Sequence, residues 1–205
     1  MTESSFAIEF TRFYLAAFFT FVAGFYTIRI IVKKRSGIKE VVFPGPYLSA
    51  SWWNHMLFRF FRAAIWMVCV VRAVFPSLDG YLGVCSFLFV TPYVVAGTLL
   101  LTFGFGLAVT VHMKMGRQWR SGIAPQEPEN LTTDGLYRYS RNPMFVGVGL
   151  AQIGFFFALP SIFTAVCLVV GLYALRSQTL EEETHLQARF KQDYLQYKSR
   201  VRRWV

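Results

Sequence analysis

Charged residues and cysteines are scarce in this sequence of 205 residues. Only 16% of the residues are charged, whereas 55% are hydrophobic, and this balance argues against both a water-soluble domain and a disordered chain. The three cysteines, Cys69, Cys85 and Cys167, stand alone inside apolar runs. Their spacing excludes a disulfide framework and a structural zinc module, so we expect no metal site.

Positive charge is the one polar feature present in excess. The formal net charge is +10, a balance typical of nucleic-acid-binding proteins. The 22 phenylalanines and the long apolar runs leave no water-filled surface for a duplex, so we expect no nucleic-acid partner. A basic membrane protein, in contact with membrane lipids, is the better interpretation.

Apolar runs predict the fold. A helix needs roughly 20 residues to cross the hydrocarbon core of a bilayer, and two of the runs are shorter, so we expect those two to cross as a packed pair that turns at Pro160. The runs cover residues 13–32, 57–75, 81–111, 144–159 and 161–175. We therefore predict an all-α polytopic membrane protein with five transmembrane helices.

Lysines and arginines predict the orientation. If the N-terminus lies outside, the inner segments are 33–56, 112–143 and 176–205, and these contain many basic residues. The outer turns, at 77–80 and at Pro160, contain no lysine or arginine, as the positive-inside rule requires. We expect two regions: residues 1–111, with three transmembrane helices, and residues 112–205, with the chemistry.

Four arginines near the ends of the predicted spans have a simple structural explanation. Long basic side chains at such positions reach out to the lipid headgroups, and we expect this anchoring role for all four. They are Arg29, Arg59, Arg62 and Arg72.

Polar residues that the bilayer does not explain gather in two places, the loop before the final hairpin and the segment after it. In the loop, Asn142 is a favourable helix cap and Pro143 suits the first helical position. That explanation leaves out Arg141, which directly precedes a hydrophobic helix at the membrane surface.

The segment after the fifth run opens with three consecutive carboxylates. Glu181, Glu182 and Glu183 suit either a solvated helix start or a site for a cationic ligand. Apolar residues then recur every three or four positions, which predicts an amphipathic helix on the inner membrane face. They are Leu186, Phe190, Tyr194, Tyr197 and Val201.

Two blocks at a fixed separation resemble a known family. They read Leu131-x3-Gly135-x-Tyr137-x3-Arg141-Asn142-Pro143-x-Phe145-x-Gly147 and Glu182-Glu183-x2-Leu186-x3-Phe190-x3-Tyr194-x2-Tyr197-x3-Val201. The combination is similar to the isoprenylcysteine carboxyl methyltransferases and their prokaryotic and phospholipid methyltransferase relatives, over about residues 112 to 203. Many members have histidine where Asn142 stands, tyrosine where Phe145 stands and glycine where Lys191 stands.

The resemblance implies an S-adenosylmethionine-dependent methyltransferase, similar to protein-S-isoprenylcysteine O-methyltransferases. It implies a cofactor pocket on the cytosolic side, formed by the loop before the hairpin and the C-terminal segment. The partner would be a lipophilic small molecule or a lipid-anchored substrate. The cofactor-binding residues implied in this way are Leu131, Gly135, Tyr137, Pro143, Met144, Phe145, Glu182 and Glu183.

The same resemblance gives Arg141 and Asn142 catalytic roles. The Arg141 fork would orient a carboxylate or an anionic headgroup, and Asn142 would add a hydrogen bond but cannot act as a base. Neighbouring helical residues point about 100° apart, so we expect only one of Glu182 and Glu183 to face the cofactor. The other is left to pair with Arg176 or Arg141. If the acceptor needs a base, His112 and His185 are available.

Two other functions remain open at this point. One is an NADPH-dependent membrane reductase of the related sterol reductase architecture, and the other is a non-catalytic membrane adaptor whose charges are only surface features. One packing feature also leaves a choice. Gly147 and Ala151 form a small-residue face, which could pack within the final hairpin or between chains.

Overall fold

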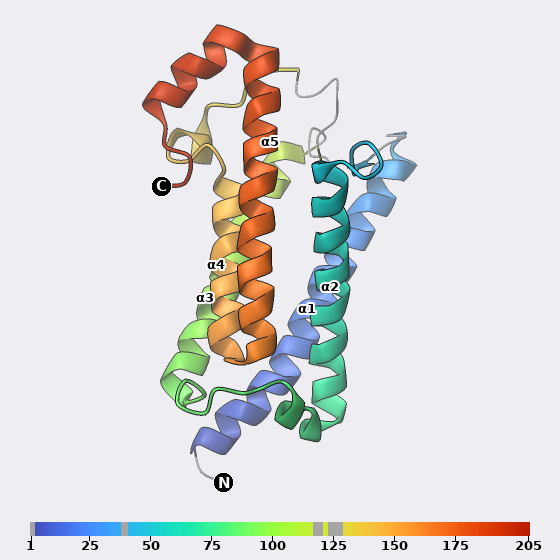
Figure 1. Ribbon diagram of the computed structural model, residues 1–205, viewed down its shortest axis with the longest axis vertical. Coiled ribbons are helices and arrows are strands. Elements are labelled where there is room, and N and C mark those ends of the chain that lie inside the picture. Colours follow the sequence, from blue (N-terminus) through green and yellow to red (C-terminus); the bar gives the residue numbers. More distant parts are fainter. Residues whose placement is uncertain (1–2, 38–40, 117–120, 123–128) are drawn as a thin grey trace.

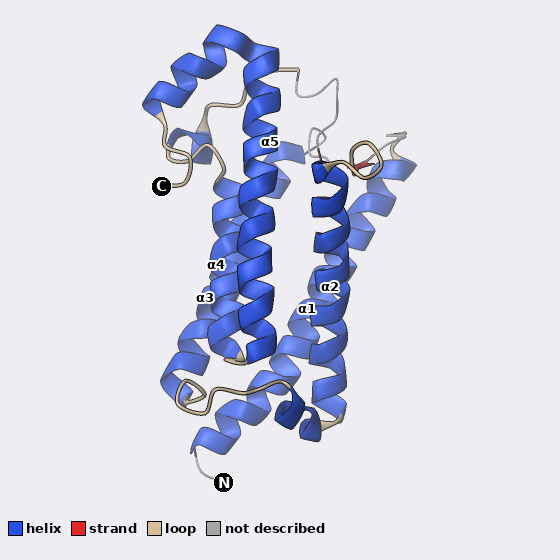
Figure 2. Cartoon of the chain, viewed as in Figure 1, coloured by secondary structure: helices blue, strands red, loops and turns tan. Residues whose placement is uncertain are grey.

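The structure is a computed structural model that describes residues 3–37, 41–116, 121–122 and 129–205. Most of these residues are helical (Figures 1 and 2), which confirms the all-α expectation. The long helices are α1 (Glu3–Arg35), α2 (Ala50–Val74), α3 (Thr91–Met115), α4 (Pro143–Ala158) and α5 (Ile162–Arg200). Shorter elements are the 3-10 helices η1 (Pro76–Tyr81) and η3 (Gly135–Arg138) and the strands β1 (Val42–Phe43) and β2 (Ser121–Gly122), which pair in parallel.

Three of these helices are long and apolar enough to cross a membrane. They are α1, α3 and α5, while α4 is an apolar helix of 16 residues. The helix α2 is not one of these three, and its sequence contains the charged residues Arg59, Arg62 and Arg72. An integral membrane protein follows from these lengths and compositions, and five crossings stay a prediction.

The third apolar run was predicted to begin too early. Its helix starts at Thr91, not at residue 81, and Pro92 lies in its first turn. The preceding residues form turns that pack against the connection between α4 and α5. The backbone nitrogen of Cys85 donates to the Pro160 carbonyl at 2.9 Å, and that of Ile162 donates to the Gly83 carbonyl at 3.0 Å. The apolar residues before Thr91 thus form turns, although the length of the apolar run suggested a longer helix.

Helices α3 and α4 are in very close contact along rows of small residues. A Cβ atom on Gly154 would lie 2.2 Å from the backbone nitrogen of Leu101, and one on Gly147 would lie 2.7 Å from that of Ala108. A Cβ on Gly104 would meet the backbone of Ala151 at 2.5 Å. The small-residue face of Gly147 and Ala151 therefore packs against α3, and not within the final hairpin.

The final hairpin turns where the sequence predicts. Helix α4 ends at Ala158, and α5 begins after Ser161, whose side chain forms a capping box with Thr164. From Ile162 to the kink at Lys191, α5 is about 43 Å long, longer than the roughly 30 Å of the hydrocarbon core. Its apolar part ends near Leu175, and the charged part that begins at Arg176 extends beyond that thickness.

The predicted amphipathic helix is not a separate element. Residues from Glu182 to Phe190 continue α5 without a break, and the chain then kinks at Lys191, where φ is 45° and ψ is −111°. After the kink the helix folds back (Figure 1). Tyr194 and Tyr197 are buried, so the apolar face of this last segment packs against the protein.

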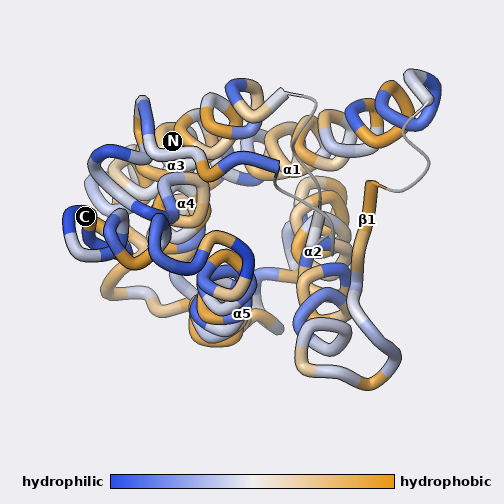
Figure 3. The backbone as a smooth tube through the Cα atoms, turned by 90° about the horizontal axis from the view of Figure 1, so that it is seen from above, coloured by the Kyte–Doolittle hydropathy of each residue, from blue (hydrophilic) through white to orange (hydrophobic). Residues whose placement is uncertain are grey.

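Connections gather at two ends of the bundle (Figure 1). One end holds the start of α1, η1 and the Pro160 turn, and the other holds β1, β2, η3 and the C-terminal segment. Seen from above, the C-terminal part of the chain is rich in hydrophilic residues (Figure 3). The structure therefore groups the predicted outer turns at one end and the predicted inner segments at the other.

Arg72 does not anchor to lipid headgroups. Its side chain is fully buried and pairs with Asp79, which also accepts hydrogen bonds from Arg12 at 2.7 and 3.2 Å. Burial of an arginine in a membrane helix requires such a partner because an unpaired charge there is costly. This ion pair ties α1 and α2 to η1 at the end that contains the N-terminus.

Candidate active site

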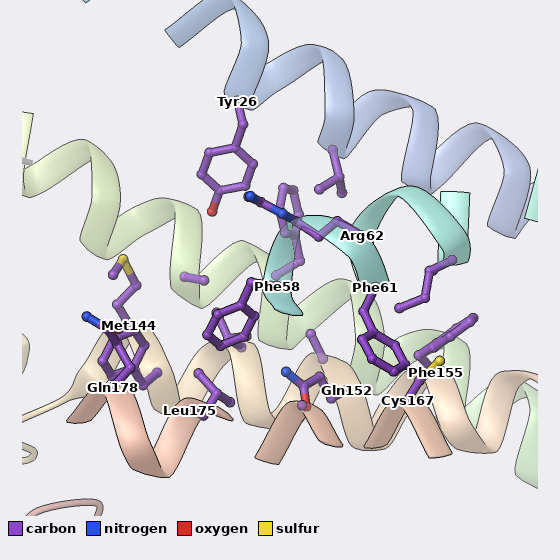
Figure 4. Close-up of a pocket in the computed structure, with 18 of the residues that line it drawn as sticks. Tyr26, Phe58, Phe61, Arg62, Met144, Gln152, Phe155, Cys167, Leu175 and Gln178 are labelled. Carbon is purple, nitrogen blue, oxygen red and sulfur yellow. The ribbon is translucent and has the colours of Figure 1, made fainter. Parts of the chain in front are cut away.

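A cavity of about 300 Å³ lies between the five long helices, at the lower limit of the usual size of ligand pockets. Its wall is mainly apolar (Figure 4). Each long helix contributes to this wall, for example through Phe19, Phe61, Leu101, Phe155 and Leu175. The cavity therefore suits a lipophilic molecule.

Polar side chains interrupt the apolar wall at a few positions. They come from α1, α2, α4 and α5 and include Tyr26, His55, Arg62, Gln152, Gln178 and Glu182. Glu182 is the acidic residue of the lining that the structure describes. A ligand in this cavity would meet both a carboxylate and a guanidinium.

Glu182 has no basic partner among the residues that the structure describes. The Gln178 side-chain nitrogen, one helical turn earlier, donates to its Oε1 atom at 3.1 Å. Burial raises the pKa of the Glu182 carboxyl to about 7; the hydrogen bond from Gln178 opposes this shift and the neighbouring Glu181 charge adds to it. A half-buried carboxylate that lines a cavity and has no basic partner among the described residues is a favourable place for a cationic ligand.

Glu183 faces a different environment. Its carboxylate pairs with Arg141 at 3.1 Å and with Arg203 at 3.0 Å, and the Asn142 side-chain nitrogen donates to it at 3.4 Å. The hydrogen bond to Glu183 raises the pKa of the Arg203 guanidinium. Two neighbouring carboxylates therefore diverge as helical geometry requires, and Arg141 is the arginine that pairs with the second of them.

The segment after the kink in α5 covers the loop that contains Arg141. The backbone nitrogen of Arg141 donates to the Arg202 carbonyl at 3.0 Å. The Arg203 carbonyl accepts from the Asn142 side chain at 3.2 Å, and the Tyr197 hydroxyl donates to the Tyr137 carbonyl at 2.7 Å. Asn142 precedes Pro143, as predicted for a cap, but its side chain bridges to Glu183 and the C-terminal segment and does not cap α4.

Two buried polar atoms beside Glu183 lack a hydrogen-bond partner in the described part of the chain. They are Nε of Arg141 and the hydroxyl of Tyr194. Burial, together with the nearby Glu183 and Glu182 charges, raises the pKa of Tyr194 to about 12, although Arg141 and Arg203 oppose this. Leaving such donors unpaired is unfavourable, so both are available to donate to a polar ligand.

The predicted site residues fall into two groups. Met144, Phe145 and Glu182 line the cavity, whereas Arg141, Asn142 and Glu183 form the adjoining polar cluster with Arg203.

The other predicted residues lie on the elements next to this cluster. Burial and the Glu182 charge raise the pKa of Tyr137 to about 12, and its hydroxyl donates to the Met115 sulfur at 3.5 Å. Gly135 begins η3 with a φ of +59°, Leu131 precedes it, and Pro143 begins α4. None of these four belongs to the described cavity lining.

Several lining residues were not predicted from the sequence. His55 and Arg62 are seven positions apart on α2 and thus share a face, and Gln178 lies one turn before Glu182. The histidines that were predicted lie elsewhere: His112 is buried at the end of α3 and accepts a hydrogen bond from Arg29 at 3.1 Å. Helical spacing puts His55 and Arg62 on one face of α2, but it does not show that this face lines the cavity.

Comparison with known protein families gives one match. A family model described as phospholipid methyltransferase matches residues 92–193, about half of the chain. The matched region begins with α3 and ends just after the kink in α5, so it includes Arg141, Glu182 and Glu183. No curated protein and no solved structure matches the chain.

Proposed function

Because the chain belongs to the phospholipid methyltransferase family of membrane methyltransferases, we propose that it transfers a methyl group from S-adenosylmethionine to a lipid-like acceptor at the cytoplasmic leaflet. The observation that carries this proposal is the position of Glu182. Its carboxylate has no basic partner in the described residues, it faces an apolar cavity, and it adjoins a cluster with two unpaired buried donors. An acidic group with hydrogen-bond donors beside it matches the methionyl part of the cofactor, which carries an ammonium and a carboxylate on one carbon.

The residues of this chain would hold the cofactor by complementary charge. S-adenosylmethionine supplies a methyl group on a positively charged sulfur, which an acceptor displaces in line. Glu182, held by Gln178, would attract the cationic part of the molecule. Nε of Arg141 and the Tyr194 hydroxyl would donate to its carboxylate.

Glu183 has a positioning role in this proposal. Its ion pairs with Arg141 and Arg203 fix the Arg141 fork and attach the C-terminal segment to it. With its charge balanced by two arginines, Glu183 is a weaker attractor of a cation than Glu182. The proposal therefore assigns the cofactor to Glu182 and the alignment of Arg141 to Glu183.

The cavity would receive the acceptor. Its apolar wall keeps water away from the reacting atoms and holds the lipophilic chain. Two acceptors suit this arrangement, the amine of a phospholipid and the carboxylate of an isoprenylated cysteine. An amine must lose a proton, and His55, which lines the same cavity, is placed to accept it. A carboxylate needs no base.

Cofactor binding tests the proposal. Isothermal titration of the detergent-purified protein should detect S-adenosylmethionine binding, and Glu182→Gln should weaken it about tenfold to a hundredfold, the usual loss of one charged contact. Glu129→Gln, which neutralises an exposed carboxylate, is the matched control and should bind like the wild type.

Two results would contradict the proposal. An absence of binding at millimolar S-adenosylmethionine would show that the protein does not use this cofactor. Binding of NADPH in its place would identify a reductase. A non-catalytic adaptor would show neither, and its partner binding would be insensitive to Glu182→Gln.

A further inference from the structure

Arg62 lies near the middle of α2, between Ala50 and Val74. Its side chain lines the cavity, and the residue is exposed. Figure 4 shows the guanidinium directed toward Tyr26 of α1, across the cavity from Gln152 and Gln178. A charged group in the wall of a mainly apolar cavity is costly unless an ionic partner or a ligand balances it.

Among the described residues, none balances the charge of Arg62 with an ion pair. Arg72 on the same helix shows the contrast, because Asp79 neutralises it. The nearest acidic residue of the described cavity lining is Glu182, on α5, and no ion pair joins the two.

A second polar group faces the same space. Gln152 of α4 lines the cavity, and its Oε1 atom is buried without a hydrogen-bond partner in the described chain. The lack of a side chain at Gly171 leaves room for it, since a Cβ there would lie 2.3 Å from that oxygen. A cation without an ionic partner and an unpaired hydrogen-bond acceptor on facing walls are typical of a binding site without its ligand. The cation suits an anionic group, and the acceptor suits a hydroxyl or ammonium group.

We propose that Arg62 binds the anionic group of the lipid acceptor, so that this protein selects acceptors with a phosphate or carboxylate close to the reacting atom. The inference rests on the proposed function and names its substrate class. Arg62 supplies the fork that matches such oxyanions, and the Gln152 oxygen can accept a hydrogen bond from a hydroxyl or ammonium group of the same ligand. Two opposite charges in one cavity then bind different ligands. Glu182 attracts the cationic part of the cofactor, and Arg62 attracts the anionic group of the lipid acceptor.

The test compares two lipids that share one chain but differ in headgroup charge. Native mass spectrometry of the full-length protein in detergent should show that oleoyl lysophosphatidic acid binds at least tenfold more tightly than monoolein. Arg62→Gln should remove this preference, while Arg62→Lys should keep part of it.

The matched control is Arg59→Gln. Arg59 has the same charge, lies about one turn away and is not part of the described cavity lining, so its loss should leave the lipid preference within twofold of wild type. A competition with inorganic phosphate separates a free anion from a headgroup: millimolar phosphate should not displace the lysophosphatidic acid, because the chain contributes to binding.

Several outcomes would overturn the inference. They are equal binding of both lipids by the wild type, an equal loss in Arg59→Gln, or complete displacement by inorganic phosphate. S-adenosylmethionine affinity is measured in parallel and should be unchanged in Arg62→Gln. This measurement checks that the variant is folded. It also separates the two proposals: a wild type that binds the cofactor but shows no lipid preference contradicts the role of Arg62 alone, and a wild type that shows the lipid preference but does not bind the cofactor contradicts the proposed cofactor site.

Discussion

At the scale of single residues, Glu182 is the residue on which the proposed cofactor binding depends most. Its carboxylate is the acidic group of the described cavity wall, and burial raises its pKa from an ordinary 4.5 to about 7. In the ligand-free protein the neutral acid is therefore favoured up to neutral pH. A cationic ligand reverses this preference because it interacts with the ionised form.

The raised pKa predicts that cofactor affinity depends on pH. Between pH 4.5 and 7 the native protein holds a proton on Glu182 that the unfolded chain has lost, so this group's contribution to stability falls as pH rises through that window. Cofactor binding expels the proton. We expect the association constant for S-adenosylmethionine to rise with pH by up to about tenfold per unit below pH 7 and then to level off.

Titration calorimetry between pH 5.5 and 8.5 measures this dependence. Glu182→Gln has no proton to lose and should give weak binding that hardly changes with pH. A wild-type affinity that is constant over the whole range would show that Glu182 does not face the cation.

Some of these residue contacts could be predicted from the sequence and others could not. The divergence of Glu182 and Glu183 follows from helix geometry, and so does the pairing of one of them with a nearby arginine such as Arg141. His55 and Arg62 were missed because α2 faces the cavity through tertiary packing. The sequence of α2 shows a basic helix but not what it faces.

The contact between α3 and α4 is the clearest feature at the scale of elements. Glycine and alanine rows allow the backbones to touch, as at Gly154, where an added Cβ would lie 2.2 Å from the Leu101 nitrogen. Gly154→Ala would force the two helices apart. We expect a loss of about 1–3 kcal/mol of stability.

Thermal unfolding in detergent measures this loss. Gly106→Ala is the matched control because Gly106 is on α3 but has no atom within 4 Å of its would-be Cβ. It should leave the midpoint unchanged or raise it slightly. Equal midpoints for both variants would contradict the close packing of α3 on α4.

The kink in α5 gives a prediction of the opposite sign. Lys191 has a φ of 45° and a ψ of −111°, a conformation that glycine adopts readily and a residue with a Cβ does not. Lys191→Gly should therefore stabilise the protein by about 1 kcal/mol. Lys198→Gly, in the helix that follows, should destabilise it by a similar amount.

The same unfolding assay compares the two variants. A lower midpoint for Lys191→Gly would mean that the chain does not bend as described. The positive φ at Lys191 gives a physical reason for the glycine that many similar sequences have at this position. The kink turns the last segment back onto the Arg141 loop.

Element boundaries were predictable where a local signal marks them. Pro143, Pro160 and the Ser161 capping box mark the final hairpin. Local signals failed in two places: the apolar residues before Thr91 belong to turns that pack on the hairpin, and the acidic triplet lies within α5 and does not begin a new helix. Both depend on contacts between distant segments.

At the scale of the whole molecule, the two ends of the bundle differ in role. The end with β1, β2, η3 and the C-terminal segment holds the polar cluster, and the other end holds the Arg12, Arg72 and Asp79 ion pair. Lysines and arginines predict that the first of these faces the cytoplasm. The structure shows that these segments gather at two ends of the bundle. Which end faces the cytoplasm is a prediction from the sequence.

Thiol labelling tests the sidedness. In a variant with Cys85→Ser, a membrane-impermeant maleimide should label Ser77→Cys in intact cells, because Ser77 is exposed in η1. Ser36→Cys, exposed after α1 at the other end, should react only after permeabilisation. The reverse pattern would place the proposed site outside the cell.

Charge asymmetry, hydropathy and two sequence blocks were enough to predict a helical membrane methyltransferase of this family. They could not predict which helices enclose the cavity, since the wall includes residues from both halves of the chain. The proposed division into residues 1–111 and 112–205 describes the sequence signals, whereas the cavity joins the two regions.

Methyl transfer itself is the most direct test of the central claim. The protein is reconstituted in vesicles that contain anionic lipids, incubated with S-adenosylmethionine labelled on its methyl group, and the extracted lipids are analysed by mass spectrometry. We predict a labelled lipid product with the wild type and with Glu129→Gln, and a loss of at least tenfold with Glu182→Gln. A wild-type protein that binds the cofactor but labels no lipid, or a Glu182→Gln variant as active as the wild type, would contradict the account.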